Sequence, residues 1–127
     1  MRLLRKFCAS ILAACAAVAT VSVSLAQPVT SGSSLTTPQG RTLYVFDNDV
    51  AGSGRSVCTG ACNGSFAPYL IEEGATVAEP LGVVLRDEGK RQWSYKGRPL
   101  YLFYADEKAG DTYGDGVNRG TWHVAKP

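Results

Sequence analysis

Histidine and methionine are nearly absent from this chain of 127 residues, which contains one of each, His123 and Met1. A single imidazole excludes a histidine-rich zinc site, because structural zinc takes four protein ligands. Serines and carboxylates are plentiful, but none lies in a nucleophile-elbow context, so no Ser–His–Asp set can be assigned. The sequence therefore predicts no catalytic residues.

A long apolar run occurs only at the N-terminus. Three basic residues precede an uncharged stretch over 7–23, and Ser24 and Ala26 place small residues at positions −3 and −1 of a cleavage site. This is the pattern of a secretory signal peptide, and the run is too rich in alanine and serine for a membrane anchor. We predict that residues 1–26 are a cleaved signal peptide. The mature protein is then exported, periplasmic or extracellular, with no transmembrane segment.

A second processing route competes with this one. Residues 12–15 (LAAC) fit the lipobox of bacterial lipoproteins, in which Cys15 becomes the lipidated N-terminus. The residues after Cys15 stay apolar as far as Ala26, whereas a lipoprotein usually continues into a polar tether. Cleavage after Ala26 is the route that we expect, and a lipid anchor at Cys15 is the alternative.

Residues 27–127, the predicted mature protein, also lack a large excess of positive or negative charge. The chain has 13 basic and 11 acidic residues, and three of the basic ones lie in the signal peptide. Ten basic residues remain against 11 acidic ones, a net charge near −1. No basic patch indicates nucleic acid, so we expect no nucleic-acid partner. About 100 residues suffice for one small domain with a modest core.

The mature sequence is organised around a motif that occurs twice. Residues 40–49 (GRTLYVFDND) and 97–106 (GRPLYLFYAD) share six positions, G-R-x-L-Y-x-F-x-x-D, at an offset of 57 residues. Such a match in a short chain predicts two similar repeat units, over about 36–71 and 93–125. The aromatic and acidic motif residues are Tyr44, Phe46, Asp49, Tyr101, Phe103 and Asp106.

Each motif begins with a segment that has the composition of a β-strand, rich in β-branched and aromatic residues. In the first, Leu43 and Val45 fall on one face, and Tyr44 and Phe46 fall on the other. A strand that is apolar on both faces is typically covered on both faces. The motif aromatic residues are therefore predicted to be mainly core residues, although exposed tyrosines would instead form a binding surface.

The motif aspartates, Asp49 and Asp106, follow these strands at turns. We expect them to accept hydrogen bonds from the turn backbone or from Arg41 and Arg98. The motif would then be a folding signature and not an active site.

The remaining segments also favour β-structure. Residues 81–85 and 91–95 are separated by a charged turn, which predicts a hairpin. No segment has a helical period. We predict a mostly β fold, a single small domain of two similar β-rich repeat units over 35–127, preceded by a flexible leader at 27–34.

The repeated Y-x-F-x-x-D motif, at 44–49 and 101–106, resembles that of bacterial secreted-repeat proteins of unknown function. These are also described as predicted lipoproteins with a Yx(FWY)xxD motif. The C-x-G-x-C loop at 58–62 and the G-D-x-x-G stretch at 110–114 agree with this resemblance, which covers residues 35–125. It implies export and a tandem-repeat β domain, and it supplies no activity.

Cys58 and Cys62 are the residues best suited to chemistry. An even pair in an exported protein indicates a disulfide first, and Gly60 allows the short loop to turn. A copper-type metal site with His123 is an alternative. A redox-active dithiol is another, although the spacing and βαβ context of thioredoxin-like proteins are absent.

We therefore expect an exported, envelope-associated or periplasmic β module with a binding or structural role and no cofactor. Its partner is unidentified, a cell-envelope component being one candidate. The alternative function is a metal-handling or thiol-redox accessory protein that uses Cys58, Cys62 and His123.

Overall fold

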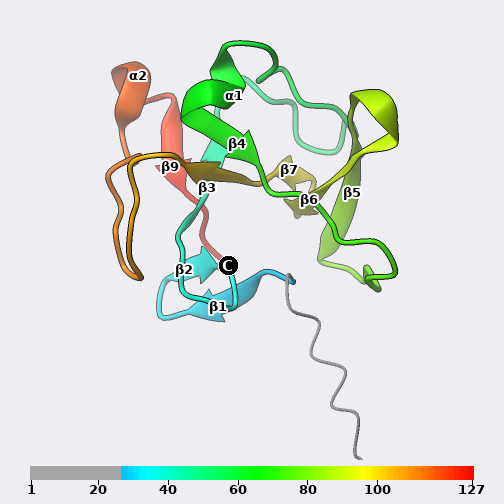
Figure 1. Cartoon of the computed structure of the whole chain (residues 1–127), viewed down its shortest axis with the longest axis horizontal. Coiled ribbons are helices and arrows are strands. Elements are labelled where there is room, and N and C mark those ends of the chain that lie inside the picture. The colour runs from blue at the N-terminus through cyan, green and yellow to red at the C-terminus, as the bar shows by residue number, and fades with distance from the viewer. Residues whose placement is uncertain (1–26) are drawn as a thin grey trace, which may run out of the picture.

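The computed structural model describes residues 27–127, so the predicted signal peptide and its alternative lipobox lie outside the described part. Within that part, nine short strands form three antiparallel sheets, which confirms the mostly β prediction (Figure 1). None of its helices is long and apolar enough to span a bilayer. The elements are β1 (Val29–Ser31), β2 (Ser34–Thr36), β3 (Leu43–Phe46), α1 (Cys62–Ser65), β4 (Phe66–Pro68), β5 (Leu81–Leu85), η1 (Asp87–Gly89), β6 (Arg91–Tyr95), β7 (Arg98–Pro99), β8 (Tyr101–Phe103), α2 (Val117–Gly120) and β9 (Trp122–Val124).

The central sheet has the strand order β4–β8–β3–β9. The two motif strands, β3 and β8, lie side by side, with Tyr44 directly opposite Tyr101. The outer strand of each repeat does not pair with its own motif strand. Instead β4 of the first repeat pairs with β8, and β9 of the second repeat pairs with β3. Each repeat is thus completed by the other.

The strand register is the same in the two halves. On one side Phe46 lies opposite Trp122, and on the other Phe103 lies opposite Phe66. Phe46 corresponds to Phe103 in the repeated motif, and each outer strand follows a four-residue segment, α1 or α2, although the backbone of α2 is left-handed at Asn118 and Arg119. The predicted pair of similar units is therefore present, related by a pseudo-twofold axis through the central sheet.

A hairpin precedes each motif strand, β1–β2 in the first repeat and β5–β6 in the second. The inner strand of each hairpin, β2 or β6, also forms a backbone hydrogen bond with the other repeat. The Leu35 N–H donates to the Ala125 carbonyl over 2.8 Å, and the Trp93 N–H donates to the Tyr69 carbonyl over 2.9 Å. The crossing therefore extends beyond the central sheet.

Strand β1 lies inside the range 27–34 that the sequence assigned to a flexible leader. Val29 pairs with Thr36 and Ser31 with Ser34, and all three β1 residues are exposed. Serine, threonine and glycine are as common in a short exposed hairpin as in a linker, so composition alone does not separate the two.

The central sheet is covered on both faces, as the alternation of Leu43 and Tyr44 predicted. One face carries an aliphatic core with one tryptophan, and the other carries an aromatic core. The aliphatic core consists of Leu35, Leu43, Ile71, Leu81, Trp93, Leu100 and Ala125. The aromatic core consists of Tyr44, Phe46, Cys58, Phe66, Tyr101, Phe103 and Trp122.

Candidate functional site

Each motif tyrosine donates a hydrogen bond to the motif aspartate of the other repeat. Tyr44 Oη lies 2.5 Å from Asp106 Oδ2, and Tyr101 Oη lies 2.5 Å from Asp49 Oδ2. Both tyrosines are fully buried, and both aspartates are buried as well. These two pairs, the crossed Tyr–Asp pairs, join the repeats through charge-assisted hydrogen bonds, which are stronger than neutral ones.

The second carboxylate oxygen of each aspartate holds the loop that follows it. Asp49 Oδ1 accepts from the Val57 N–H over 2.7 Å, and Asp106 Oδ1 accepts from the Tyr113 N–H over 3.0 Å. Arg41 donates to the main-chain carbonyl of Asp106, and no contact joins it to the carboxylate in the described structure. Turn backbone, one of the two sources that the sequence suggested, therefore supplies one donor to each aspartate, and the tyrosine of the other repeat supplies a second that the sequence did not suggest.

Each phenol oxygen also has a partner from the loop opposite. Ser56 Oγ lies 2.6 Å from Tyr101 Oη, and the Gly114 N–H donates to Tyr44 Oη over 3.2 Å. A Cβ at Gly114 would lie 2.9 Å from ring atoms of Tyr44 and Phe103, so a side chain does not fit there. This close approach explains the final glycine of the G-D-x-x-G stretch.

The tyrosine hydroxyls are held in their protonated form. Burial raises the pKa of Tyr44 and Tyr101 far above the ordinary value, and the hydrogen bond to a carboxylate raises the pKa further. A phenol that keeps its proton throughout the physiological range acts as a steady donor and is poorly suited to proton transfer.

The motif phenylalanines belong to a stack of four rings that crosses both repeats. Phe46 stacks on Trp122 with centroids 4.3 Å apart, Trp122 on Phe66 at 3.5 Å, and Phe66 on Phe103 at 4.7 Å. Tyr101 meets Trp122 edge to face, and Tyr44 meets Phe66 in the same way. The aromatic motif positions therefore lie in the interior.

Cys58 and Cys62 are joined by a disulfide with an S–S distance of 2.05 Å. Arg86 fastens this loop to the second hairpin, donating to the Cys58 carbonyl, Asn63 Oδ1 and Gln92 Oε1, each over 3.0 Å. Gln92 is fully buried and donates onward to the Leu100 carbonyl, between β7 and β8. The disulfide loop is thus anchored through a guanidinium that is bonded to neutral acceptors.

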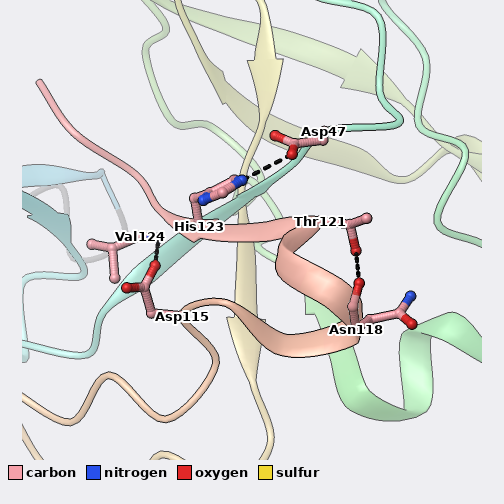
Figure 2. A network of polar contacts seen from close by, with 6 residues as sticks. All are labelled: Asp47, Asp115, Asn118, Thr121, His123 and Val124. Atoms are coloured by element: carbon pink, nitrogen blue, oxygen red, sulfur yellow. Dashed lines mark hydrogen bonds and ion pairs between the residues drawn. The ribbon is translucent and has the colours of Figure 1, made fainter.

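His123 lies elsewhere, on the exposed side of β9. Its Nε2 is 2.8 Å from Asp47 Oδ2, and the two side chains point toward one another in Figure 2. Among residues 27–127, no group of three His, Cys, Asp or Glu side chains is arranged to hold a metal ion. The structure therefore does not bring His123 together with Cys58 and Cys62.

A groove of about 670 Å³, here called the β9 groove, opens beside this strand. It collects residues from β2, the β6–β7 turn, the loop before α2 and the C-terminal end. Val45, Arg98 and His123 are the lining residues for which the sequence gave a specific expectation. The clearest signal was Arg98, which repeats Arg41 in the motif and is exposed where Arg41 is half-buried. The charged lining residues are Lys96, Arg98, Asp115, His123 and Lys126.

The fold is a tandem-repeat β domain. Its two β units interlock through the crossed Tyr–Asp pairs and a shared aromatic stack. The chain belongs to the family described as a secreted repeat of unknown function, whose model matches residues 29–68 and 82–126. The first match spans β1 to β4, and the second spans nearly all of β5 to β9. Comparisons with curated proteins and with solved structures gave no match. The predicted family resemblance is confirmed.

Proposed function

We propose that the protein is an exported β module, periplasmic or envelope-associated, whose role is binding or structural. One observation carries this proposal: the motif side chains are engaged with one another in the interior. Asp49 and Asp106 are held by phenols and backbone N–H groups, so their carboxylates are not available to a substrate. The description of the family as secreted and the predicted signal peptide support export.

The sequence left open a metal-handling or redox role for the cysteines. Cys58 is fully buried in the aromatic core and Cys62 is half-buried against it, so one of the two sulfur atoms is inaccessible, which favours a structural disulfide over an exchanging one. A soft-metal site would need further ligands near the sulfur atoms. The cysteine pair therefore supports a role in holding the loop.

The test uses the full chain of 127 residues, expressed in a bacterium with residues 1–26 retained. The protein is then recovered from the periplasm, the membranes and the medium. Intact-mass analysis should give a species that begins at Gln27. A diacylglycerol-modified species beginning at Cys15 would instead establish a lipid anchor. Free-thiol titration and elemental analysis of the same sample should find no free thiol and no stoichiometric metal.

A matched variant makes the metal test decisive. Stoichiometric copper on the reduced wild type, lost in a Cys58→Ala, Cys62→Ala variant, would overturn the proposal in favour of metal handling. Retention of the protein in the cytoplasm would overturn its export.

A further inference from the structure

We propose that the β9 groove binds the anionic group, a carboxylate or a phosphate, of a ligand whose apolar part lies against Tyr95 and Val45. This inference rests on the proposed binding role. The groove measures about 670 Å³, within the size range of small-ligand sites. Its lining combines apolar side chains with a few charged ones, the usual composition of such sites.

The charge of the groove is the first argument. Lys96, Arg98 and Lys126 all line it, and within residues 27–127 none of the three has a carboxylate within salt-bridge distance. Asp115 also lines the groove, where its Oδ1 accepts a hydrogen bond from the Val124 N–H over 3.1 Å (Figure 2), so the three cations outnumber this one carboxylate. Three of the ten basic residues of a slightly acidic mature protein therefore gather at one opening.

The two motif arginines provide the second argument. Arg41 donates to the main-chain carbonyls of Phe103 and Asp106 and so belongs to the internal framework. Arg98, at the same motif position, is exposed and lines the groove instead. Arg41 therefore has a structural role, whereas the guanidinium of Arg98 is accessible to a ligand. A guanidinium can bind a carboxylate or a phosphate through two parallel hydrogen bonds.

The β6–β7 turn, which presents Lys96 and Arg98, is held rigidly. A Cβ at Gly97 would lie 2.5 Å from the Gly52 nitrogen, and the Gly52 N–H donates to the Gly97 carbonyl over 2.9 Å. The Lys96 N–H donates to the Pro80 carbonyl over 2.9 Å. Lys96 Nζ lies 5.4 Å from the centroid of the Tyr95 ring, within the range of a cation–π contact. A preorganised turn lowers the entropy lost when a ligand binds.

The remaining lining residues indicate what shape of ligand the groove would fit. Val45, Val124 and Tyr95 supply apolar surface next to the cations, and Val45 also packs against the aliphatic core. The imidazole of His123, which also lines the groove, is paired with Asp47 and adds a polar side chain to this lining. A ligand with one anionic end and an apolar or ring-shaped body matches both surfaces.

The test is an NMR titration of the purified exported protein with phenyl phosphate, inorganic phosphate and benzoate, with benzamide as the neutral probe. We expect shifts centred on the backbone amides of Tyr95, Lys96 and Arg98, a weaker effect at higher salt, and none with benzamide. Arg98→Gln should weaken binding roughly tenfold, the effect of losing a charged hydrogen-bond donor. Arg98→Lys, which keeps the charge but loses the fork, should fall in between.

Arg55→Gln is the matched control, because Arg55 is an exposed arginine that lines a different pocket. Equal loss of affinity in Arg55→Gln and Arg98→Gln, or shifts spread over all surface cations, would overturn the inference. Absence of binding by an exported, disulfide-bonded, metal-free protein would overturn it too, while leaving the proposed function standing.

The source of the anionic group is distinguished by a competition. Free glycerol phosphate is compared with vesicles of equimolar phosphatidylglycerol and phosphatidylcholine, each used to displace phenyl phosphate. Displacement by the free ester alone supports a soluble ligand, and displacement by the vesicles supports a lipid headgroup. Both results keep the anion site, and failure of both probes contradicts it.

Discussion

Phe66 and Trp122 lie face to face, with ring centroids 3.5 Å apart and ring planes within 3° of parallel. Each is the first residue of the outer strand of its repeat, β4 or β9. Two equivalent residues therefore meet at the pseudo-twofold axis. The centre of the aromatic core belongs to neither repeat alone.

Removal of one ring from this contact should be costly. Phe66→Ala should lower the free energy of unfolding by about 3–5 kcal/mol, as for other buried aromatic residues, which is a large part of a small domain's stability. Tyr113→Ala is the control, because that side chain is 65% exposed and should change stability by less than about 0.5 kcal/mol. Urea unfolding measures both, and similar values for the two variants would contradict the stacked arrangement.

The crossed Tyr–Asp pairs predict a specific pattern of coupling. Tyr44→Phe should cost about 1.5–3 kcal/mol, because the bond that it removes ends on a buried carboxylate. In a double-mutant cycle, Tyr44→Phe and Asp106→Asn should couple, whereas Tyr44→Phe and Asp49→Asn should add within about 0.5 kcal/mol. Stronger coupling to Asp49, in the same repeat, would show that the pairs are not crossed.

Stability should fall at alkaline pH. Burial, with the hydrogen bond to a carboxylate, raises the pKa of Tyr44 and Tyr101 above the ordinary value of 10.0, so the folded state keeps protons that the unfolded chain releases. The resulting stabilisation is fully present below pH 10 and is lost as the pH rises beyond it. Tyr69 acts in the same direction, because burial and the nearby Glu72 raise its pKa to about 12.

Unfolding midpoints measured across this pH range should therefore decline, and the decline should be shallower in a Tyr44→Phe, Tyr101→Phe variant. If all tyrosinate absorbance appeared near pH 10 while the protein stayed folded, the burial of these phenols would be disproved.

The disulfide should pin one loop without holding the whole domain together. Its cysteines are only four positions apart, so the chain-entropy model gives about 2 kcal/mol. Cys58→Ala with Cys62→Ala should lower the melting temperature and leave a folded β domain by circular dichroism. The second repeat has Gly114 where the first has Cys58, and its loop is ordered without a cross-link. Complete unfolding of the double variant would rule out this loop-pin role.

Arg86 is predicted to matter more than an exposed arginine. Arg86→Lys loses the fork that reaches Cys58, Asn63 and Gln92 together, which should cost about 1–3 kcal/mol because Gln92 is fully buried. Arg55→Lys, at an exposed position, is the matched control. Thermal unfolding compares the two, and equal stability would mean that the Arg86 contacts contribute nothing.

The strands that carry the motif were predictable from sequence, because Tyr44 and Leu43 alternate and the pattern recurs at Tyr101 and Leu100. The crossing was not predictable. A duplicated sequence shows that two units are alike, and strands that pair within a unit or between units can use the same residues. The helical turns α1 and α2 are four residues long, too short to produce a helical period.

The groove was missed for a different reason. Ser34, Lys96 and Lys126 are far apart in the chain and become neighbours only after β2, the β6–β7 turn and the C-terminal end assemble. None of them belongs to a motif with known ligand spacing. The partner of His123 was missed as well, since Asp47 comes next to it only through the pairing of β3 with β9.

The exchange of outer strands means that neither repeat is a complete unit by itself. A chain carrying a single repeat would have half an aromatic stack and unpaired strand edges, and a second copy could supply both through an isologous contact. The present chain is thus the covalent equivalent of such a homodimer, with residues 69–81 as the fused connection between the matched segments. The same geometry offers full-length chains a route to intertwined dimers, in which β8 and β9 of one molecule complete β3 and β4 of another.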